Sequence, residues 1–374
     1  MKRRTIALAS FLALCPSFAL ADAGTPLVCA SGLHILLGNA ILGLLEGWLL
    51  AKVFKLKRGR CIGLLILANY FSAWLGMFVI DALRASQTVD IYNALRLLLI
   101  LVFLTYLLTL SLEWPFVALC FRKSPRWFPR SVKASLLIQT LSYLLLFGGF
   151  WLVSGTSLYT HFSIVPAEDV SLPPDVTVYF ISKDDGHVYR RSSHGERQMV
   201  FELASTSTWD FLRFQESRTG PGLWDLVAVL GLRRDYDDAI VIVAHLIAST
   251  SDSASLTQQY WGWGSAPQIG TAANSAWRFS WAHWPSVGLY GSEQETGEQV
   301  RVSFGTPVMG WPVWRAIHLP ENKVLFQLGD DQLCLLDIST KCISLWDRGH
   351  GPVAVAEEEL SKKAIAQQRV KPRT

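Results

Sequence analysis

Apolar and polar residues follow two different patterns along the 374-residue chain. Residues 1–154 consist of long apolar runs separated by short basic segments, whereas later residues largely alternate between apolar and polar. Apolar runs of about 20 residues are typical of transmembrane helices, and alternation is typical of half-buried strands. We therefore predict an α + β chain with separate domains, in which a four-helix transmembrane bundle precedes an all-β exported domain.

The first pattern divides into four spans and a leader. Residues 1–21 have a basic start and a short apolar run ending in Ala19-Leu20-Ala21, which is the pattern of a cleavable signal peptide. An uncleaved first anchor is the alternative. The transmembrane domain is predicted over residues 22–154, and each span is about long enough to cross ~30 Å of hydrocarbon. The predicted spans are residues 33–54, 61–80, 97–120 and 134–154.

Basic residues predict the orientation of these spans. Ten of them cluster in the first and third connections: Lys52, Lys55, Lys57, Arg58, Arg60, Arg122, Lys123, Arg126, Arg130 and Lys133. Positively charged loops stay in the cytoplasm, so the C-terminal half is expected outside it. This predicts a multi-pass protein of the plasma (inner) membrane with a periplasmic C-terminal domain. The net charge of only +4, concentrated beside apolar runs, argues against a nucleic-acid surface.

Each predicted span carries one polar side chain at a similar depth. Glu46, Asn69, Glu113 and Gln139 all lie about 9–13 Å from the basic boundary at 1.5 Å of rise per residue. A buried carboxyl group needs partners, so we expect the four groups to converge, with at least one carboxyl group protonated at neutral pH. Such a layer either stabilises the bundle by hydrogen bonds or forms a proton, ion or small-ligand site.

The first span also carries a stripe of small residues. Gly43, Gly47 and Ala51 recur every four residues and therefore share one helix face. Small residues let a second helix approach closely inside a membrane. We predict that this stripe is a helix-packing face and that Glu46, beside it, points into the bundle.

The C-terminal half is predicted to be a β-repeat domain over residues 176–352, between a linker (155–175) and a charged tail (353–374). The segments "VYFISKDDGHVY" and "VLFQLGDDQLCL" each run from an apolar strand through paired aspartates to a second strand. They resemble propeller repeats, although no named family is indicated. The resemblance implies a small or incomplete β-propeller of about four blades, with a β-sandwich as the alternative.

Candidate chemistry in this half is sparse. The paired aspartates match turn preferences better than a calcium loop, and no HExxH, GxSxG, P-loop or CxxC motif occurs. We therefore expect neither cofactor nor metal, and an enzyme is disfavoured. Among the clustered tryptophans, the candidate binding aromatics are Trp261, Trp263, Trp281 and Trp284, with core filling as the alternative. Cys334 and Cys342 form a disulfide only if their hairpin turn centres on Ile338.

These features favour a membrane-anchored protein that presents an extracytoplasmic binding or interaction domain. Its expected partners are the lipid bilayer and an envelope protein or glycan, without nucleic acid. One alternative is a small transporter or sensor that uses the polar layer around Glu46. The other is an enzyme acting on an envelope glycan, which is supported by the clustered aromatic residues alone.

Overall fold

The computed structural model describes residues 37–84, 89–193, 195–231, 239–248, 263–282, 288–306 and 310–360. The chain divides into two compact units, one of residues 1–154 with 306–309 and the other of residues 155–305 with 310–374. The first unit thus ends at residue 154, where the predicted transmembrane domain also ends. The expected signal peptide and the end of the expected tail, beyond residue 360, lie outside the described residues.

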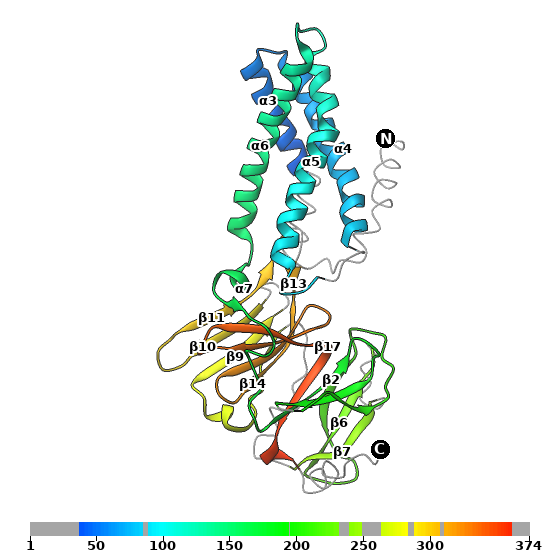
Figure 1. Cartoon of the computed structure of the whole chain (residues 1–374), viewed down its shortest axis with the longest axis vertical. Helices are drawn as coiled ribbons and strands as arrows, with labels where there is room; N and C mark the ends of the chain where they lie inside the picture. Colours follow the sequence, from blue (N-terminus) through cyan, green and yellow to red (C-terminus); the bar gives the residue numbers. More distant parts are fainter. Residues whose placement is uncertain are drawn as a thin grey trace, which may run out of the picture. The chain divides into compact units, whose positions relative to one another are not determined.

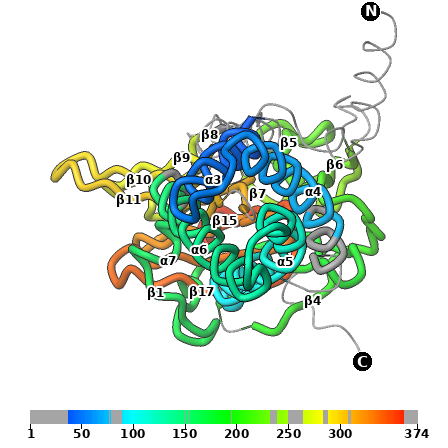
Figure 2. Tube along the Cα trace, turned by 90° about the horizontal axis from the view of Figure 1, so that it is seen from above, coloured from blue at the N-terminus to red at the C-terminus, as the bar shows by residue number. Residues whose placement is uncertain are grey.

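The first unit is a bundle of four helices (Figure 1). Each helix packs against two neighbours in the cyclic order α3, α4, α5, α6, as the end-on view shows (Figure 2). Lys55 and Arg126 adopt left-handed backbone conformations where α3 ends and where α6 begins. The helices are α3 (Asn39–Phe54), α4 (Arg58–Arg84), α5 (Ala94–Phe121) and α6 (Trp127–Val153).

The bundle is apolar outside and partly polar inside. Large apolar side chains such as Leu45, Phe103 and Leu144 are exposed, whereas Glu113 and Gln139 are buried. A water-soluble bundle has the opposite arrangement, since its apolar face is turned inward. Exposed apolar surface of this extent is typical of a protein that contacts lipid.

By length and composition, two segments among the described residues qualify as membrane-crossing helices, Ala94–Phe121 and Trp127–Gly149. The sequence analysis expects four. The described part of α3 has only 16 residues, shorter than the ~20 that a span needs. Helix α4 carries Arg58 and Arg60 at its start and Asp81 and Arg84 at its end, and its uncharged part coincides with the predicted span 61–80.

The predicted small-residue stripe lies at the contact between α3 and α4. Gly43, Gly47 and Ala51 are all buried. A Cβ atom on Gly43 would lie 2.5 Å from the Cα of Ile66, and one on Gly47 would lie 2.5 Å from the Cα of Ile62. Because the obstacle is backbone rather than a movable side chain, only glycine permits this approach.

We predict that Gly47→Ala destabilises the bundle, because the new methyl group forces α3 and α4 apart. The expected loss of unfolding free energy is about 2 kcal/mol or more, typical of an overpacked core. Thermal unfolding of the full chain in detergent measures it. Gly63→Ala on α4 is the matched control, since a Cβ there meets nothing within 4 Å. Equal melting temperatures for the two variants would contradict the close-packing account.

The second unit is built from 17 strands among the described residues, and all but β17 have nine residues or fewer. It also contains α7 (Ser157–Thr160), two 3₁₀ turns, η4 (Gly270–Asn274) and η5 (Glu357–Glu359), and the first strand, β1 (Ser163–Ile164), within the expected linker. The other strands are β2 (Val176–Ser182), β3 (Val188–Ser192), β4 (Gln198–Phe201), β5 (Phe211–Glu216), β6 (Leu223–Val229), β7 (Ile240–Ala248), β8 (Trp263–Ser265), β9 (Trp277–Ala282), β10 (Gly288–Glu293), β11 (Gln299–Val302), β12 (Phe304–Gly305), β13 (Gly310–Trp311), β14 (Val313–Leu319), β15 (Lys323–Leu328), β16 (Gln332–Asp337) and β17 (Cys342–Ala356).

The largest sheet has eight strands and curls into a half-barrel. Its order is β14-β15-β16-β17-β2-β3-β4, with β1 added parallel to β17. The remaining sheets are β11-β10-β9-β8, β5-β6-β7 and the two-stranded β12-β13. The long strand β17 pairs with β16 through its first half and with β2 through its second half (Figure 1).

The propeller that the sequence resemblance implies is not confirmed. Propeller blades are separate sheets. Here β17 joins the strands β14, β15 and β16 on one side to β2, β3 and β4 on the other, in one continuous sheet. The two similar sequence segments do form hairpins, β2-β3 and β15-β16, and both belong to this curled sheet. The sheet also extends to Ala356, beyond the expected end of the domain at residue 352.

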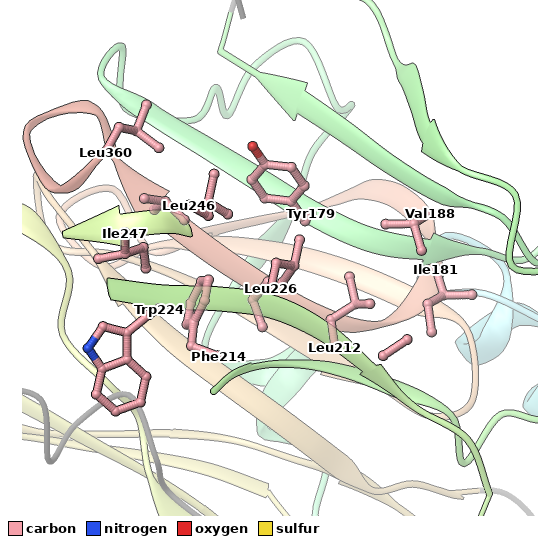
Figure 3. Packing of buried hydrophobic residues seen from close by; sticks show 13 residues of the cluster. Tyr179, Ile181, Val188, Leu212, Phe214, Trp224, Leu226, Leu246, Ile247 and Leu360 are labelled. Carbon is pink, nitrogen blue, oxygen red and sulfur yellow. The ribbon is translucent and has the colours of Figure 1, made fainter. Parts of the chain in front are cut away.

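Strand β2 contributes to two cores because it is buried on both faces. Tyr179 and Ile181 pack with Leu212 and Leu226 of the β5-β6-β7 sheet (Figure 3). On the other face, Phe180 and its neighbours pack with side chains of β14 to β17. The alternation of β2 side chains between two cores explains its apolar run from Val178 to Ile181.

Candidate functional site

The polar layer predicted in the helical unit is centred on two buried glutamates. The amide nitrogen of Asn69 on α4 donates to Oε2 of Glu46 on α3 at 2.7 Å. The hydroxyl of Ser142 on α6 donates to Oε1 of the same carboxyl group at 2.5 Å. Asn69 also donates to the backbone carbonyl of Leu65 at 3.0 Å. Glu46 therefore connects three helices.

The second glutamate has a similar environment. Ser72 on α4 donates its hydroxyl to Oε1 of Glu113 on α5 at 2.5 Å, and Gln139 on α6 donates its amide nitrogen to Oε2. Glu113 is 1% exposed and Gln139 is 2% exposed. Together the two carboxyl groups link all four helices, and each carboxyl oxygen has a donor.

The donors that meet the glutamates are uncharged. No described basic side chain forms an ion pair with either carboxyl group. Buried hydrogen bonds of this kind specify one arrangement of helices, because any rotation leaves a polar group unpaired. The geometry is therefore that of a cross-linked bundle interior.

Sequence reasoning names four members of this layer, and the structure brings them together in the pairs Glu46–Asn69 and Glu113–Gln139. Ser72 and Ser142 also belong to the layer but were not predicted from the sequence. A serine in a helix usually bonds to its own backbone, so its type alone gives no signal. Their positions give one, since Ser72 and Ser142 each follow a predicted layer residue, Asn69 or Gln139, by three residues on the same helix face.

The paired aspartates of the β unit are used within hairpin turns and ion pairs. Asp185 accepts a hydrogen bond from the hydroxyl of Tyr189 at 2.6 Å, and Asp331 pairs with Lys183 at 3.1 Å and with Arg348 at 3.3 Å. Among the described residues, no group of three or more His, Cys, Asp or Glu side chains is arranged to hold a metal ion.

Of the four predicted binding tryptophans, Trp281 is the one whose side chain the structure describes. Trp281 is 2% exposed and lies on the inner face of β9 with Trp277 and Phe279. Trp281 therefore matches the core-filling alternative, because its side chain is buried together with those of Trp277 and Phe279. Trp263 lies in β8, while Trp261 and Trp284 lie outside the described residues.

A different pair of tryptophans lies at the surface. Trp209, which precedes β5, is 54% exposed and meets half-buried Trp314 of β14 edge-to-face, with ring centroids 5.2 Å apart. The neighbouring Arg315 lies 4.0 Å from the ring centroid of Phe211. Strand register shifts at Trp314, and such bulges re-aim side chains. We call Trp209, Trp314 and Arg315 the aromatic patch.

The carboxylate beside the patch is unavailable to a ligand. Asp210 is buried and accepts hydrogen bonds from the hydroxyl of Ser205 and from the backbone of Gly231, both at 2.5 Å. This arrangement does not supply the exposed pair of carboxylates that glycoside hydrolysis requires.

The possible disulfide between Cys334 and Cys342 is not formed, and both residues are free thiols. The hairpin closes with Asp337 opposite Cys342, so its turn comprises residues 338–341 and does not centre on Ile338. Cys334 is instead paired with Leu345. The two cysteines are thus three positions out of register.

Two histidines are buried in the β unit. Burial lowers the pKa of His318 to about 4, and the nearby positive charge of Arg278 adds to this effect. The pKa of His350 also falls to about 4, chiefly through burial, with Asp210 opposing the shift. Neither ring nitrogen of His350 has a hydrogen-bond partner among the described residues.

These features define a two-unit protein, a helical bundle with an apolar exterior and a cross-linked polar interior, joined to a β unit with a surface aromatic patch. No protein-family model matches the sequence. A comparison with curated proteins likewise finds no significant match.

Proposed function

We propose that the protein is a multi-pass membrane protein whose helical unit is a membrane anchor and whose β unit is an extracytoplasmic interaction domain. The observation that carries this proposal is the pairing of both buried glutamates. Each carboxyl oxygen already accepts a hydrogen bond from a neighbouring helix. A bundle interior satisfied in this way suits a stable anchor.

The exterior of the bundle supports a position in the bilayer. Exposed Leu, Ile and Phe side chains surround it, and two of its helices are long and apolar enough to cross. In this proposal α3 and α4 cross as well, because they share the polar layer with α5 and α6. An even number of crossings puts both ends of the anchor on one side, and the basic loops favour the cytoplasm for the opposite side.

A reporter that is active only in the cytoplasm, fused after Thr374, tests this orientation. We expect no signal from it, and a strong signal from an export-dependent reporter at the same position. A reporter fused within the basic segment 55–60 is the matched control and should behave in the opposite way. Cytoplasmic activity at Thr374 would refute the extracytoplasmic assignment.

The aromatic patch is the proposed contact surface of the β unit, and an envelope protein is its proposed partner. Tryptophan and arginine are enriched among residues that dominate protein–protein binding energy. Trp209 is both exposed and held by Trp314, so binding immobilises little additional side-chain freedom.

Capture from envelope extracts by the full chain in detergent tests this surface. We expect the wild type to retain a partner that Trp209→Ala retains at least tenfold less, while Met199→Ala, at another exposed apolar position, retains it normally. Equal retention by all three would refute the patch. Retention of a glycan would change the partner class, and retention of nothing would refute the interaction function.

The two carboxyl groups in one layer favour a second candidate, a proton-coupled transporter or sensor. Glu46 and Glu113 are titratable groups buried inside the helical unit, and buried carboxyl groups of this kind mark proton pathways in many membrane proteins. Under this alternative, Glu46→Gln folds normally but abolishes function. Under the anchor proposal the same variant retains the interaction of the β unit.

A further inference from the structure

Two cysteines face each other across the contact between α4 and α5. Cys61 lies in the first turn of α4 and Cys120 in the last turn of α5, and their side chains are close enough to interact electrostatically. The thiol of Cys120 donates a hydrogen bond to the carbonyl of Phe116 at 3.6 Å. Their exposed fractions are 1% and 7%. Both belong to the apolar cluster at this end of the bundle, with Phe121 and Leu65.

A backbone contact beside the thiols fixes their register. The guanidinium of Arg60 donates a hydrogen bond to the carbonyl of Leu119 at 2.9 Å. Arg60 and Leu119 immediately precede Cys61 and Cys120, so the contact holds the two cysteines at the same level. The positive charge of Arg60 also acts on both thiols.

We propose that Cys61 and Cys120 form a reversible thiol–disulfide site, which exchanges with a low-molecular-weight disulfide and links α4 to α5. Both cysteines belong to one buried cluster at the α4–α5 contact, Cys61 follows the loop at residues 55–57 closely, and the guanidinium of Arg60 lies beside them. The described cysteines of the β unit lack this arrangement, since Cys334 and Cys342 are out of register.

The exchange proceeds in two balanced steps. The thiolate of Cys61 attacks one sulfur of the small disulfide, forms a mixed disulfide and releases one small thiolate. The thiolate of Cys120 then attacks the sulfur of Cys61 and releases the second small thiolate. The two protons lost by the cysteines are taken up by these leaving groups, so two protein thiols are oxidised and one small disulfide is reduced to two thiols.

The position of each cysteine assigns these roles. Cys61 lies at a helix N-terminus, where the helix dipole stabilises negative charge, and Arg60 supports the thiolate during the attack. Cys120 lies at a helix C-terminus and resolves the mixed disulfide. In the topology proposed above, this end of the bundle faces the cytoplasm, where thiols rest in the reduced state and disulfides are transient.

Treatment of the full chain in detergent with oxidised glutathione, and separately with the more lipophilic dipyridyl disulfide, tests the site. We expect peptide mapping to find a Cys61–Cys120 disulfide, an intact mass lower by about 2 Da, and loss of alkylation at both thiols. The link should raise the melting temperature by about 5 °C or more, and a dithiol reductant should reverse every change.

Single variants separate the two steps. Cys120→Ser should stop at a stable mixed disulfide on Cys61, and Cys61→Ser should react far more slowly at Cys120. Cys334 and Cys342 serve as internal controls that should not become linked to each other. If both reagents leave Cys61 and Cys120 alkylatable, or link them to other cysteines instead, the proposal is wrong whichever way the protein lies in the membrane.

Discussion

Replacing Glu46 with leucine should lower the unfolding free energy of the helical unit by about 2–4 kcal/mol, because it removes the acceptor of two buried donors. Ser142 loses its hydrogen bond to the carboxyl group, and Asn69 keeps only its bond to Leu65. The thermal midpoint of the full chain in detergent measures this loss.

Glu46→Gln is the matched control for that variant. The amide oxygen of a glutamine accepts from Asn69, and its amide nitrogen donates to the hydroxyl of Ser142, so both contacts survive in the same space. We expect a melting temperature close to that of the wild type. The wild type and Glu46→Gln should unfold at similar temperatures, and Glu46→Leu should unfold at a lower one.

A double-mutant cycle shows whether the loss comes from unpaired donors. Glu46→Leu combined with Ser142→Ala removes both partners of one bond, so its cost should be smaller than the sum of the single costs. The same design applies to Glu113 with Ser72. Leucine variants as stable as the wild type would contradict the cross-linked bundle.

The polar layer was largely predictable because helix geometry is fixed. A rise of 1.5 Å per residue converts distance from the basic boundary into depth, so the level of Glu46, Asn69, Glu113 and Gln139 follows from counting. Which of them pair depends on the rotation of each helix and on its neighbours. Helix rotation and neighbours are set by side-chain packing. The sequence indicated the rotation of α3 alone, through the small-residue stripe that includes Gly47.

The hairpins of the β unit were also predictable, since Asp-Gly and paired-Asp turns join neighbouring strands. The joining of β17 to β2 was not. It pairs Ala356 with Val176, 180 residues apart, and no local pattern identifies such a partner. The propeller interpretation therefore found the hairpins correctly but treated them as separate blades.

The tryptophans also show that contacts between distant chain segments cannot be read from local sequence patterns. The alternation in "WRFSWA" already points Trp277, Phe279 and Trp281 to one face, and that face is the core. Trp209 stands outside any periodic segment, so sequence alone gave no reason to select it. Its contact with Trp314 arises from chain segments that meet only in the folded unit.

Acidification from pH 6.5 to pH 4 should destabilise the β unit by up to about 3 kcal/mol for each of His318 and His350. Both have a pKa of about 4 in the folded protein, below the ordinary value near 6.5. As the pH falls through this window, the unfolded chain binds protons that the folded chain does not. The stability is therefore fully present above pH 6.5 and is lost as the pH falls toward 4.

The surroundings of His318 explain why it resists protonation. The amide nitrogen of Gln268 lies 3.1 Å from Nδ1, and the same nitrogen donates to the carbonyls of Ala272 and Trp277. An amide nitrogen donates and does not accept, so its contact with Nδ1 is a hydrogen bond only while Nδ1 is unprotonated. The ring of Phe279 packs edge-to-face against the ring of His318, with the two ring centroids 4.9 Å apart.

Melting temperatures of the full chain at pH 7 and pH 4.5 measure this effect, with His318→Gln and His350→Gln compared against the wild type. Carboxyl groups also titrate in this range, so the informative quantity is the difference in pH dependence between each variant and the wild type. Each variant should lose less stability on acidification than the wild type does, whatever its stability at pH 7. His161→Gln, at an exposed histidine, controls for the substitution itself. An acid-induced loss that is the same in all four proteins would show that the buried histidines are not its source.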